Sequence, residues 1–291
     1  MASFPSPGDF VVPLFFGERA GVRALAAKNV LCSISEVMSQ ITRRKFLKLG
    51  ALAVPTLVGL DARFIEPVGL RVAHFKLDPS GKCRLVHFSD FHFKGDKQFA
   101  AKVVRTINGL APNFVCFTGD LVEHRCFANG ALEFVRQIEA PVYGCPGNHE
   151  YSSGVSFRDC EKAFAATGGA WLADRNLLLE SHDLEIVGMG IVGLNIVPPL
   201  PASHRVLLIH YPLMADRLGD RRFDLILAGH SHGGQVRLPL WGSIIVPKGV
   251  GSYDLGHYAT KGGPLYVNPG IGTYRLPFRF NCPPEITVIT I

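Results

Sequence analysis

Five short apolar runs, each followed at once by polar residues, constrain the fold of this chain more than any other feature. They span residues 84–89, 114–118, 142–145, 205–209 and 225–228, and they are rich in β-branched residues without a helical period. Runs of this kind predict buried β-strands. Helical patterns cover residues 97–110, 129–139 and 157–167. The alternation predicts βαβ units, and therefore a largely parallel central sheet with helices outside it.

The C-terminal part of the chain has a different pattern. Residues 235–250, 263–267 and 285–291 are strand-like, and Gly and Pro interrupt them. We expect them to form a second, more antiparallel sheet packed against the first. Hydrophobic residues make up 47% of the 291 residues and charged residues 19%. This composition allows a sizeable core, which excludes disorder, collagen and coiled coil as descriptions of the whole chain.

The N-terminal region contains a segment that predicts an export signal. The segment around Arg43 and Arg44, followed by a moderately apolar stretch to Leu60, resembles a twin-arginine export signal. The apolar stretch is short and is interrupted by Gly and Pro, whereas a spanning helix needs about 20 apolar residues. A basic amphipathic helix is the alternative interpretation of this segment.

The chain is therefore expected to have three regions. We expect residues 1–37 to be disordered or never translated, since Met38 is a plausible start. Residues 38–62 are expected to form the signal or a membrane tether, and residues 63–291 the globular domain. The corresponding location is the inner membrane or, after export by the twin-arginine route, the periplasm or cell envelope.

The charge balance favours an anionic partner. The formal net charge of +6 suits an anionic substrate, a membrane surface or nucleic acid equally well. The body of the chain has no single-sign run of Lys and Arg of the kind that follows a phosphate backbone, so we expect no nucleic-acid partner. The seven cysteines include no C-x-x-C pair, which argues against a disulfide scaffold and against a thiolate zinc site.

The polar residues that end the five runs form a set of possible metal ligands. In open α/β sheets, ligands bind at the carboxyl ends of strands, where neighbouring loops converge. Carboxylate, amide and imidazole groups together suit Mn²⁺, Fe or Zn²⁺ better than Ca²⁺, and we favour Mn²⁺. Asp120 has two oxygens with lone pairs to spare, so it can bridge two metals. The candidates are Asp90, His92, Asp120, Asn148, His149, His210, His230 and His232.

Five sequence blocks carry a family resemblance. SDFH, TGD, GNHE, HYP and GHSHGGQ occur in this order, and together they resemble the calcineurin-like metallophosphoesterase superfamily. The resemblance covers the chain from Arg84 to the C-terminus and identifies residues 63–291 as such a domain. It implies an α/β fold in four layers, a β-sandwich of two mixed sheets flanked by helices. It also implies two divalent metal ions.

The resemblance assigns the ligands block by block. One metal would take Asp90, His92, Asp120 and His232, and the other would take Asp120, Asn148, His210 and His230. No ligand position departs from the family's pattern, which favours an active enzyme over a binding protein that keeps the fold without turnover. Two cations about 3.5–4 Å apart would polarise the phosphoryl oxygens and lower the pKa of a bridging water, whose hydroxide would attack phosphorus.

His149 is the candidate general acid. It follows the ligand Asn148 but stands outside the ligand count, so it can protonate the leaving oxygen. We expect Asp120 or Glu150 to orient its ring. Glu123 could also reach the cleft, but an ordinary surface position is the default interpretation for that residue.

A narrower resemblance concerns the substrate. The arginine pair, the stretch GHSHGGQVRLP and the ending YVNPGIGTYRLPFRFNCPPEI are similar to an exported subgroup of bacterial phosphodiesterases. That subgroup is linked to UDP-2,3-diacylglucosamine pyrophosphate hydrolysis in lipid A synthesis, or to other envelope phosphodiesters. A nuclease is the runner-up activity. Asn268 and Arg279 could line a phosphate or sugar site, although Arg279 could equally bond backbone carbonyls.

Overall fold

The computed structural model describes residues 42–78, 81, 83–192 and 197–291. The expectation for residues 1–37 therefore lies outside the described residues. The chain divides into two compact units, Met1–Val58 and Gly59–Ile291. The described part of the first unit lies almost entirely in helix α2 (Arg43–Leu60), which exposes apolar side chains such as Phe46, Leu47 and Leu52. Within the described ranges, no helix combines the length and the apolar character needed to cross a membrane.

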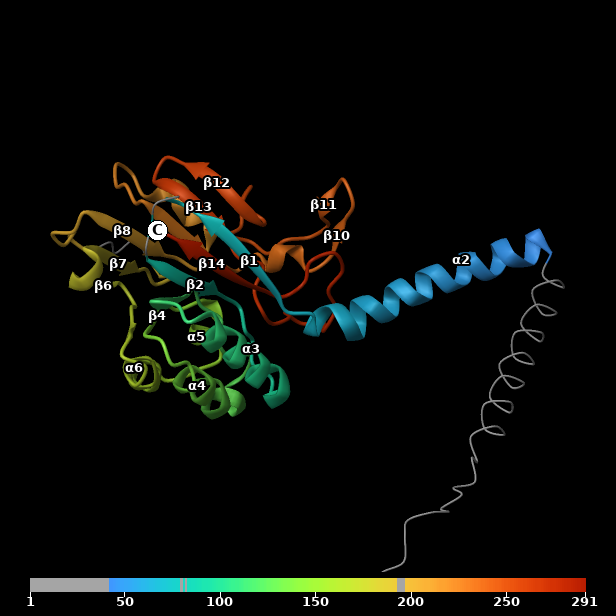
Figure 1. The fold of residues 1–291 in the computed structure, drawn as a ribbon, viewed down its shortest axis with the longest axis horizontal. Helices are drawn as coiled ribbons and strands as arrows, with labels where there is room; N and C mark the ends of the chain where they lie inside the picture. Colours follow the sequence, from blue (N-terminus) through green and yellow to red (C-terminus); the bar gives the residue numbers. More distant parts are fainter. Residues whose placement is uncertain (1–41, 79–80, 82, 193–196) are drawn as a thin grey trace, which may run out of the picture. The chain divides into compact units, whose positions relative to one another are not determined.

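The second unit contains two large mixed sheets (Figure 1). The first has the order β1 (Arg71–Lys76), β14 (Glu285–Thr290), β2 (Arg84–Phe88), β3 (Phe114–Phe117), β4 (Val142–Gly144) and β5 (Ala170–Trp171). The second has the order β12 (Gly256–Thr260), β13 (Gly263–Val267), β9 (Leu225–Ala228), β8 (His204–Leu208), β7 (Leu184–Gly188) and β6 (Arg175–Leu179). A short hairpin of β10 (Arg237–Leu238) and β11 (Gly242–Ser243) stands apart from both sheets.

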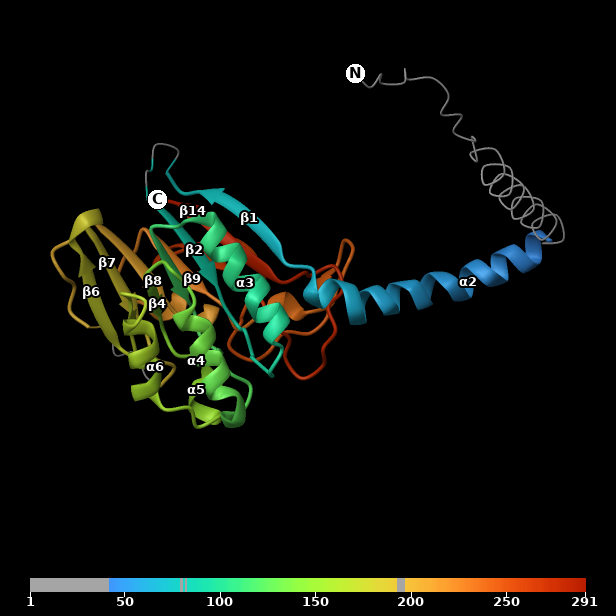
Figure 2. The ribbon, with the colours of Figure 1, turned by 60° about the horizontal axis from the view of Figure 1, so that its bottom comes forward.

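Helices cover the first sheet on its outer side (Figure 2). They are α3 (Lys97–Leu110), α4 (Ala128–Arg136) and α6 (Phe157–Ala165). Helix α3 begins where the Asp96 side chain accepts a hydrogen bond from Phe99 N, and it buries Ala100, Val103 and Ile107 on one face. A short helical segment, η5 (Pro212–Arg217), packs against the outer side of the second sheet through Ala215.

The space between the two sheets is filled by apolar side chains from both. Leu85 and Ile289 of the first sheet belong to the same buried cluster as Ile186 and Leu227 of the second. The arrangement confirms the expected α/β fold, with two mixed sheets flanked by helices in four layers. Burial of this apolar surface is the main favourable contribution to folding.

The expected strands form, but their grouping differs from the expectation. All five runs are strands to within about two residues, yet β2, β3 and β4 lie in the first sheet while β8 and β9 lie in the second. The second sheet is the more antiparallel of the two, with the pairs β12–β13 and β6–β7 against the single pair β14–β2 in the first sheet, but its central pairs are parallel. Residues 285–290 also belong to the first sheet, between β1 and β2.

Candidate metal centre

The predicted ligands follow the carboxyl ends of five strands drawn from both sheets. Asp90 and His92 follow β2, Asp120 follows β3, Asn148 follows β4, His210 follows β8, and His230 and His232 follow β9. Five of these seven residues have left-handed backbone angles, with φ of 49° at Asp90, 44° at His92, 60° at Asp120, 66° at His230 and 50° at His232. Each such residue costs about 1 kcal/mol or more. Asp and His tolerate this region better than most side chains, and the turn brings them inward at once.

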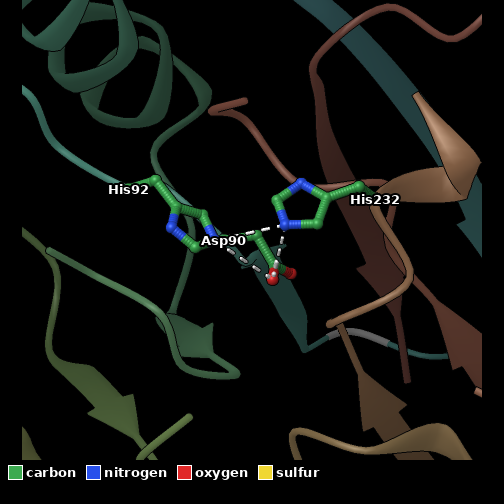
Figure 3. A group of neighbouring side chains, drawn as sticks. All are labelled: Asp90, His92 and His232. Atoms are coloured by element: carbon green, nitrogen blue, oxygen red, sulfur yellow. Dashed lines mark hydrogen bonds and ion pairs between the residues drawn. The ribbon is translucent and has the colours of Figure 1, made fainter. Parts of the chain in front are cut away.

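Three overlapping groups of side chains could each hold a metal ion. One consists of Asp90, His92 and His232, whose side chains point toward one another (Figure 3). Another consists of Asp120, His210 and His230. Asp120 lies between them, with its Oδ2 at 3.3 Å from His92 Nε2 and 3.4 Å from His210 Nε2. The structure thus places Asp120 where a bridging ligand is expected.

Asn148 and a backbone contact complete the arrangement. Asn148 Oδ1 lies 3.0 Å from His210 Nε2, so the seven predicted ligands come together in one place. The backbone N–H of His230 donates to Asp90 Oδ2 at 2.9 Å, which joins the strand ends of the two sheets. Gly147 is required beside them, because a Cβ at this position would collide with Asp120 Oδ1. The third group contains His92, Asp120 and also His149.

Hydrogen bonds on the far side of three of the four candidate imidazoles orient the ring. His92 Nδ1 lies 2.7 Å from Glu123 Oε2, His210 Nδ1 lies 2.8 Å from the Thr118 carbonyl, and His230 Nε2 lies 2.8 Å from the Lys248 carbonyl. A ring nitrogen that donates to such a partner is protonated, so the other nitrogen keeps a lone pair. Those lone pairs face the centre, as they do in histidines that bind metals.

The contacts inside the centre fit a cation. His232 Nε2 lies 3.2 Å from His92 Nε2, and His230 Nδ1 lies 3.1 Å from His210 Nε2. Asp90 Oδ1 is buried and has no hydrogen-bond partner. Two ring nitrogens this close in a buried site need a shared proton or a metal cation between them. Mixed carboxylate, amide and imidazole donors match Mn²⁺, Fe or Zn²⁺.

The pKa shifts show the same need for positive charge. Burial by itself lowers the pKa of His92 and of His210, but hydrogen bonds and charge from Asp120 outweigh it and raise both to about 9. Burial, together with the smaller effect of the neighbouring His210, lowers the pKa of His230 to about 3. Two protonated imidazoles therefore flank the Asp120 carboxylate in the metal-free chain.

His149 lies beside the centre, but its neighbours differ from the expected ones. The Glu150 carboxylate instead accepts backbone N–H bonds from Asp120, Leu121 and Gly147 at 2.7–2.9 Å. Asp120 accepts a hydrogen bond from the backbone N–H of His149 at 2.7 Å and does not hold its ring. The carboxylate beside the ring is that of Glu123, with Oε2 at 3.8 Å from His149 Nδ1. The sequence pattern predicts an ordinary surface position for Glu123. Its place three residues after the ligand Asp120 is the feature that indicates a position beside the centre.

Asn268 and Arg279 are not placed to bind a substrate. Both are fully buried. Asn268 accepts from Gly270 N at 2.7 Å and donates to Thr287 Oγ1 at 3.0 Å. The Arg279 guanidinium donates to the carbonyls of Cys282, Pro269, Gly270 and Gly272. The structure thus favours the alternative interpretation of Arg279, because its donors are occupied by backbone.

Arg279 nevertheless supports the centre. Gly272 N and Ile271 N donate to the carbonyls of Asp90 and Ser89 at 2.8 and 2.9 Å. By holding the carbonyls of Gly270 and Gly272, the buried guanidinium fixes the loop that in turn fixes the backbone at Asp90. Its role is therefore to keep a strained strand end in place.

Two connected cavities give access to the centre. A small cavity of about 60 Å³ is lined by Asp120, Asn148, His149, His230, His232, Pro247 and Tyr274. A larger one of about 600 Å³ shares His232, Pro247 and Tyr274 with it and extends past Lys248, Arg275 and Leu276. A substrate in the larger cavity would lie directly beside the candidate ligands. A mixed α/β sandwich with this buried set of ligands and an adjoining cavity defines a metallophosphoesterase, a hydrolase that acts on phosphoester bonds.

Comparison with known proteins agrees with this class. The family model for calcineurin-like phosphoesterases matches residues 83–234, and the chain belongs to this family. The uncharacterized metallophosphoesterase YkuE of Bacillus subtilis is 31% identical over 87% of this chain and 99% of its own length. Phosphodiesterase YaeI of Escherichia coli is 27% identical over 86% of this chain and 99% of its own. UDP-2,3-diacylglucosamine pyrophosphatase LpxG of Chlamydia trachomatis is 27% identical over 82% of this chain and 94% of its own.

Proposed function

We propose that the chain binds two divalent metal ions, with manganese as the favoured metal, and hydrolyses a phosphodiester or pyrophosphate bond. The observation that carries the proposal is the position of Asp120, whose Oδ2 lies within 3.4 Å of imidazole nitrogens from both ligand groups. Two bound cations would polarise the phosphoryl group and supply a hydroxide nucleophile. Asp90, His92 and His232 would hold one ion with Asp120, and Asn148, His210 and His230 the other.

His149 supplies the proton for the leaving oxygen in this proposal. Its side chain is 14% exposed and lines the small cavity, so it can meet a substrate there. Burial lowers the pKa of the ring, whereas the charges of Asp120 and Glu123 oppose this shift and favour the protonated form that donates the proton. Glu123 contacts His92 and lies beside His149, and thus positions a metal ligand and the acid together.

The proposed substrate is lipid-linked, with UDP-2,3-diacylglucosamine as the first candidate. The support is the similarity to LpxG, whose name specifies that pyrophosphatase activity. The larger cavity offers matching chemistry, because its lining combines apolar Ile245 and Leu276 with the exposed cations Lys248 and Arg275. Another envelope phosphodiester is the alternative, and the similarity to phosphodiesterase YaeI favours it.

We propose that residues 38–62 direct the chain to the membrane by the twin-arginine route, either as a cleaved signal or as a tether. The arginine pair at the start of helix α2 supports this. Replacing Arg43 and Arg44 by Lys should remove the protein from the periplasm and from carbonate-washed membranes, which retain a tether but not a surface contact. Unchanged recovery of the Lys variant in both fractions would contradict the proposal.

The activity assay uses the full chain loaded in turn with Mn²⁺, Zn²⁺ and Fe²⁺. UDP-2,3-diacylglucosamine and a simple aryl phosphodiester are the substrates, and Asp120→Ala is the blank. Release of UMP from the nucleotide lipid supports the first candidate and requires that residues 38–62 tether the domain on the cytoplasmic side without translocation. Turnover of the aryl diester alone keeps the hydrolase and selects another envelope diester. No metal-dependent turnover of either substrate contradicts the proposed function.

A further inference from the structure

A group of large apolar side chains is exposed next to the metal centre. Leu240 is 104% exposed and Trp241 86%, and four neighbours are also exposed. We call these six residues the apolar rim: Leu238, Leu240, Trp241, Ile244, Ile245 and Leu276. Five of them lie in or beside the β10–β11 hairpin, which projects from the body of the second unit (Figure 1). Exposed large apolar side chains gathered on one hairpin and the residues beside it mark a site of interaction.

The hairpin is anchored at its base. Arg237 Nη1 donates to Asp254 Oδ2 at 2.8 Å and to the Gly233 carbonyl at 2.9 Å. Ser243 Oγ donates to the same Asp254 oxygen at 2.8 Å. The base is therefore fixed to the body while Leu240 and Trp241 at the tip point into solvent. Exposure of the tip is a property of a held hairpin, and burial of these side chains requires a partner.

The rim is connected to the centre through the larger cavity. Ile245 and Leu276 line the same cavity of about 600 Å³ as His232 and Tyr274. The segment after the hairpin also contacts a candidate ligand, because His230 Nε2 donates to the Lys248 carbonyl at 2.8 Å. Whatever covers the rim therefore lies at the mouth of the cavity that leads to the metal ligands.

The charges around the apolar rim indicate which kind of partner fits it. Residues 235–250 and 271–281 contain Arg237, Lys248, Arg275 and Arg279 and no Asp or Glu. Of these, Lys248 and Arg275 are exposed, whereas Arg237 is paired with Asp254 and Arg279 is buried. Exposed apolar and cationic side chains together match the boundary between headgroups and acyl chains of an anionic bilayer. Trp is enriched at this boundary, since its ring is apolar and its N–H is polar.

A second exposed apolar pair flanks the same part of the fold. Phe64 and Ile65, in the short helical segment Asp61–Ile65, are 60% and 63% exposed. The following residue, Glu66, accepts a hydrogen bond from Asn281 N at 2.9 Å, and Arg237 N donates to the Phe280 carbonyl at 2.9 Å. Residues 280–281 thus connect the hairpin to the segment that carries Phe64 and Ile65.

We propose that the apolar rim inserts into the interface of an anionic lipid bilayer while Lys248 and Arg275 contact its headgroups. The cavity then opens at the lipid surface and receives its substrate from there. A fluid bilayer adapts to the protruding tip, whereas a protein partner would need a pocket shaped for Leu240 and Trp241. The proposal adds a lipid bilayer as a partner of the chain. It rests on the proposed function only for the identity of the substrate that enters the cavity.

Trp241 provides a direct test in the full chain. The protein has two tryptophans, and the other, Trp171, is 3% exposed. Vesicles of phosphatidylglycerol and phosphatidylethanolamine should shift the Trp241 emission to shorter wavelength, and phosphatidylcholine vesicles should do so more weakly. Trp241→Phe should lose the shift.

Leu240→Asp should weaken vesicle partitioning about tenfold or more, because a buried apolar group is replaced by a charge facing an anionic surface. Val192→Asp, at another exposed aliphatic position, is the matched control and should partition like the wild type.

The outcomes distinguish bilayer insertion of the apolar rim from membrane contact by another segment, from self-association and from the proposed function. Co-sedimentation with vesicles without a Trp241 shift would mean that another segment, such as α2, makes the contact, and it would overturn the proposal. Self-association without vesicles that Leu240→Asp abolishes would assign the rim to a second copy of the chain instead. Leu240 does not line the cavity, so Leu240→Asp should turn over the aryl diester like the wild type. A Trp241 shift without turnover would contradict the proposed function and leave the bilayer contact standing.

Discussion

The metal centre and the apolar rim depart from the usual distribution of side chains in opposite directions. The centre buries charged and polar groups, with Asp90 at 0% and Asp120 at 2% exposed. The rim exposes apolar ones, with Leu240 at 104%. Both arrangements are unfavourable in the isolated chain, since charged groups are rarely buried unpaired and large apolar side chains favour the interior. Each is relieved by a partner from outside the chain: cations at the centre and, as we propose, lipid at the rim.

The two regions also differ in how firmly the fold holds them. The centre is supported by buried groups such as Glu150, which accepts three backbone N–H bonds, and Arg279, which donates to four carbonyls. The rim depends on a short hairpin whose base is fixed mainly through Asp254. The centre is thus preorganised for its ligand, whereas the rim suits a deformable one. Changes at the centre should leave vesicle binding intact, and changes at the rim should leave turnover of a water-soluble diester intact.

The largest expected effect is that of Asp120→Ala. This variant removes the carboxylate that lies between both ligand groups, so turnover of the aryl diester should fall about 10³-fold or more. Metal analysis of the dialysed protein should show reduced content. The shift of Trp241 emission on adding anionic vesicles should be retained. Loss of both turnover and vesicle binding would show that the centre and the rim depend on each other.

His149→Asn should have the next largest effect. Because the ring is a candidate proton donor and not one of the seven proposed ligands, metal content should match the wild type. Turnover of an alkyl diester should fall about 10²- to 10³-fold, the usual contribution of general acid catalysis. An aryl diester with a good leaving group needs little protonation and should lose much less. An equal loss with both substrates would exclude the acid role.

Glu123→Gln should act mainly on metal binding. Its carboxylate accepts from His92 Nδ1 at 2.7 Å, and loss of such a partner weakens metal affinity about 10- to 100-fold. Titration with Mn²⁺ should show this weakening, and excess metal should restore most of the turnover. Glu133→Gln, on the exposed surface of α4, is the matched control and should bind metal normally. Equal affinities in the two variants would leave Glu123 without a positioning role.

The ligand positions could be predicted from the sequence because they depend on local rules. Apolar runs indicate strands, and Asp or His directly after them indicates a site at the strand ends. The pairing of the strands with one another was harder to predict from the sequence. The run at residues 285–290 has no local feature that distinguishes pairing with β1 and β2 from pairing with β13, and only the complete packing decides.

Arg279 and Glu123 show the same limit for side chains. A guanidinium binds phosphate and carbonyl oxygens with the same donors, so the sequence left both roles of Arg279 open. Its full burial and four carbonyl partners come from the loop at residues 269–282. Glu123 belongs to a polar stretch that resembles ordinary surface. The bridge between Phe93 and Val122 extends the pairing of β2 and β3 and brings Glu123 to His92.

The smallest expected effect is on the pH dependence of stability, and it belongs to the centre alone. In the metal-free chain the pKa values of His92 and His210 are raised from 6.5 to about 9, so their contribution to stability is complete below about pH 6.5 and is lost as pH rises through 9. The pKa of His230 is lowered to about 3, so its contribution is present above pH 6.5 and is lost as pH falls toward 3. The melting temperature of the EDTA-treated chain should therefore be highest near pH 6.5.

Metal binding should reverse the alkaline side of this profile. The imidazoles of His92 and His210 must lose their protons before they coordinate, so stabilisation by Mn²⁺ should grow from pH 6.5 to 9 as protons are released. Thermal unfolding of EDTA-treated and Mn²⁺-loaded protein across this range measures both curves. Parallel curves would mean that His92 and His210 do not bind the metal. The apolar rim contains none of the histidines that titrate in this range, so vesicle binding should stay constant over it. A pH-dependent Trp241 shift would show that the two regions share a titrating group.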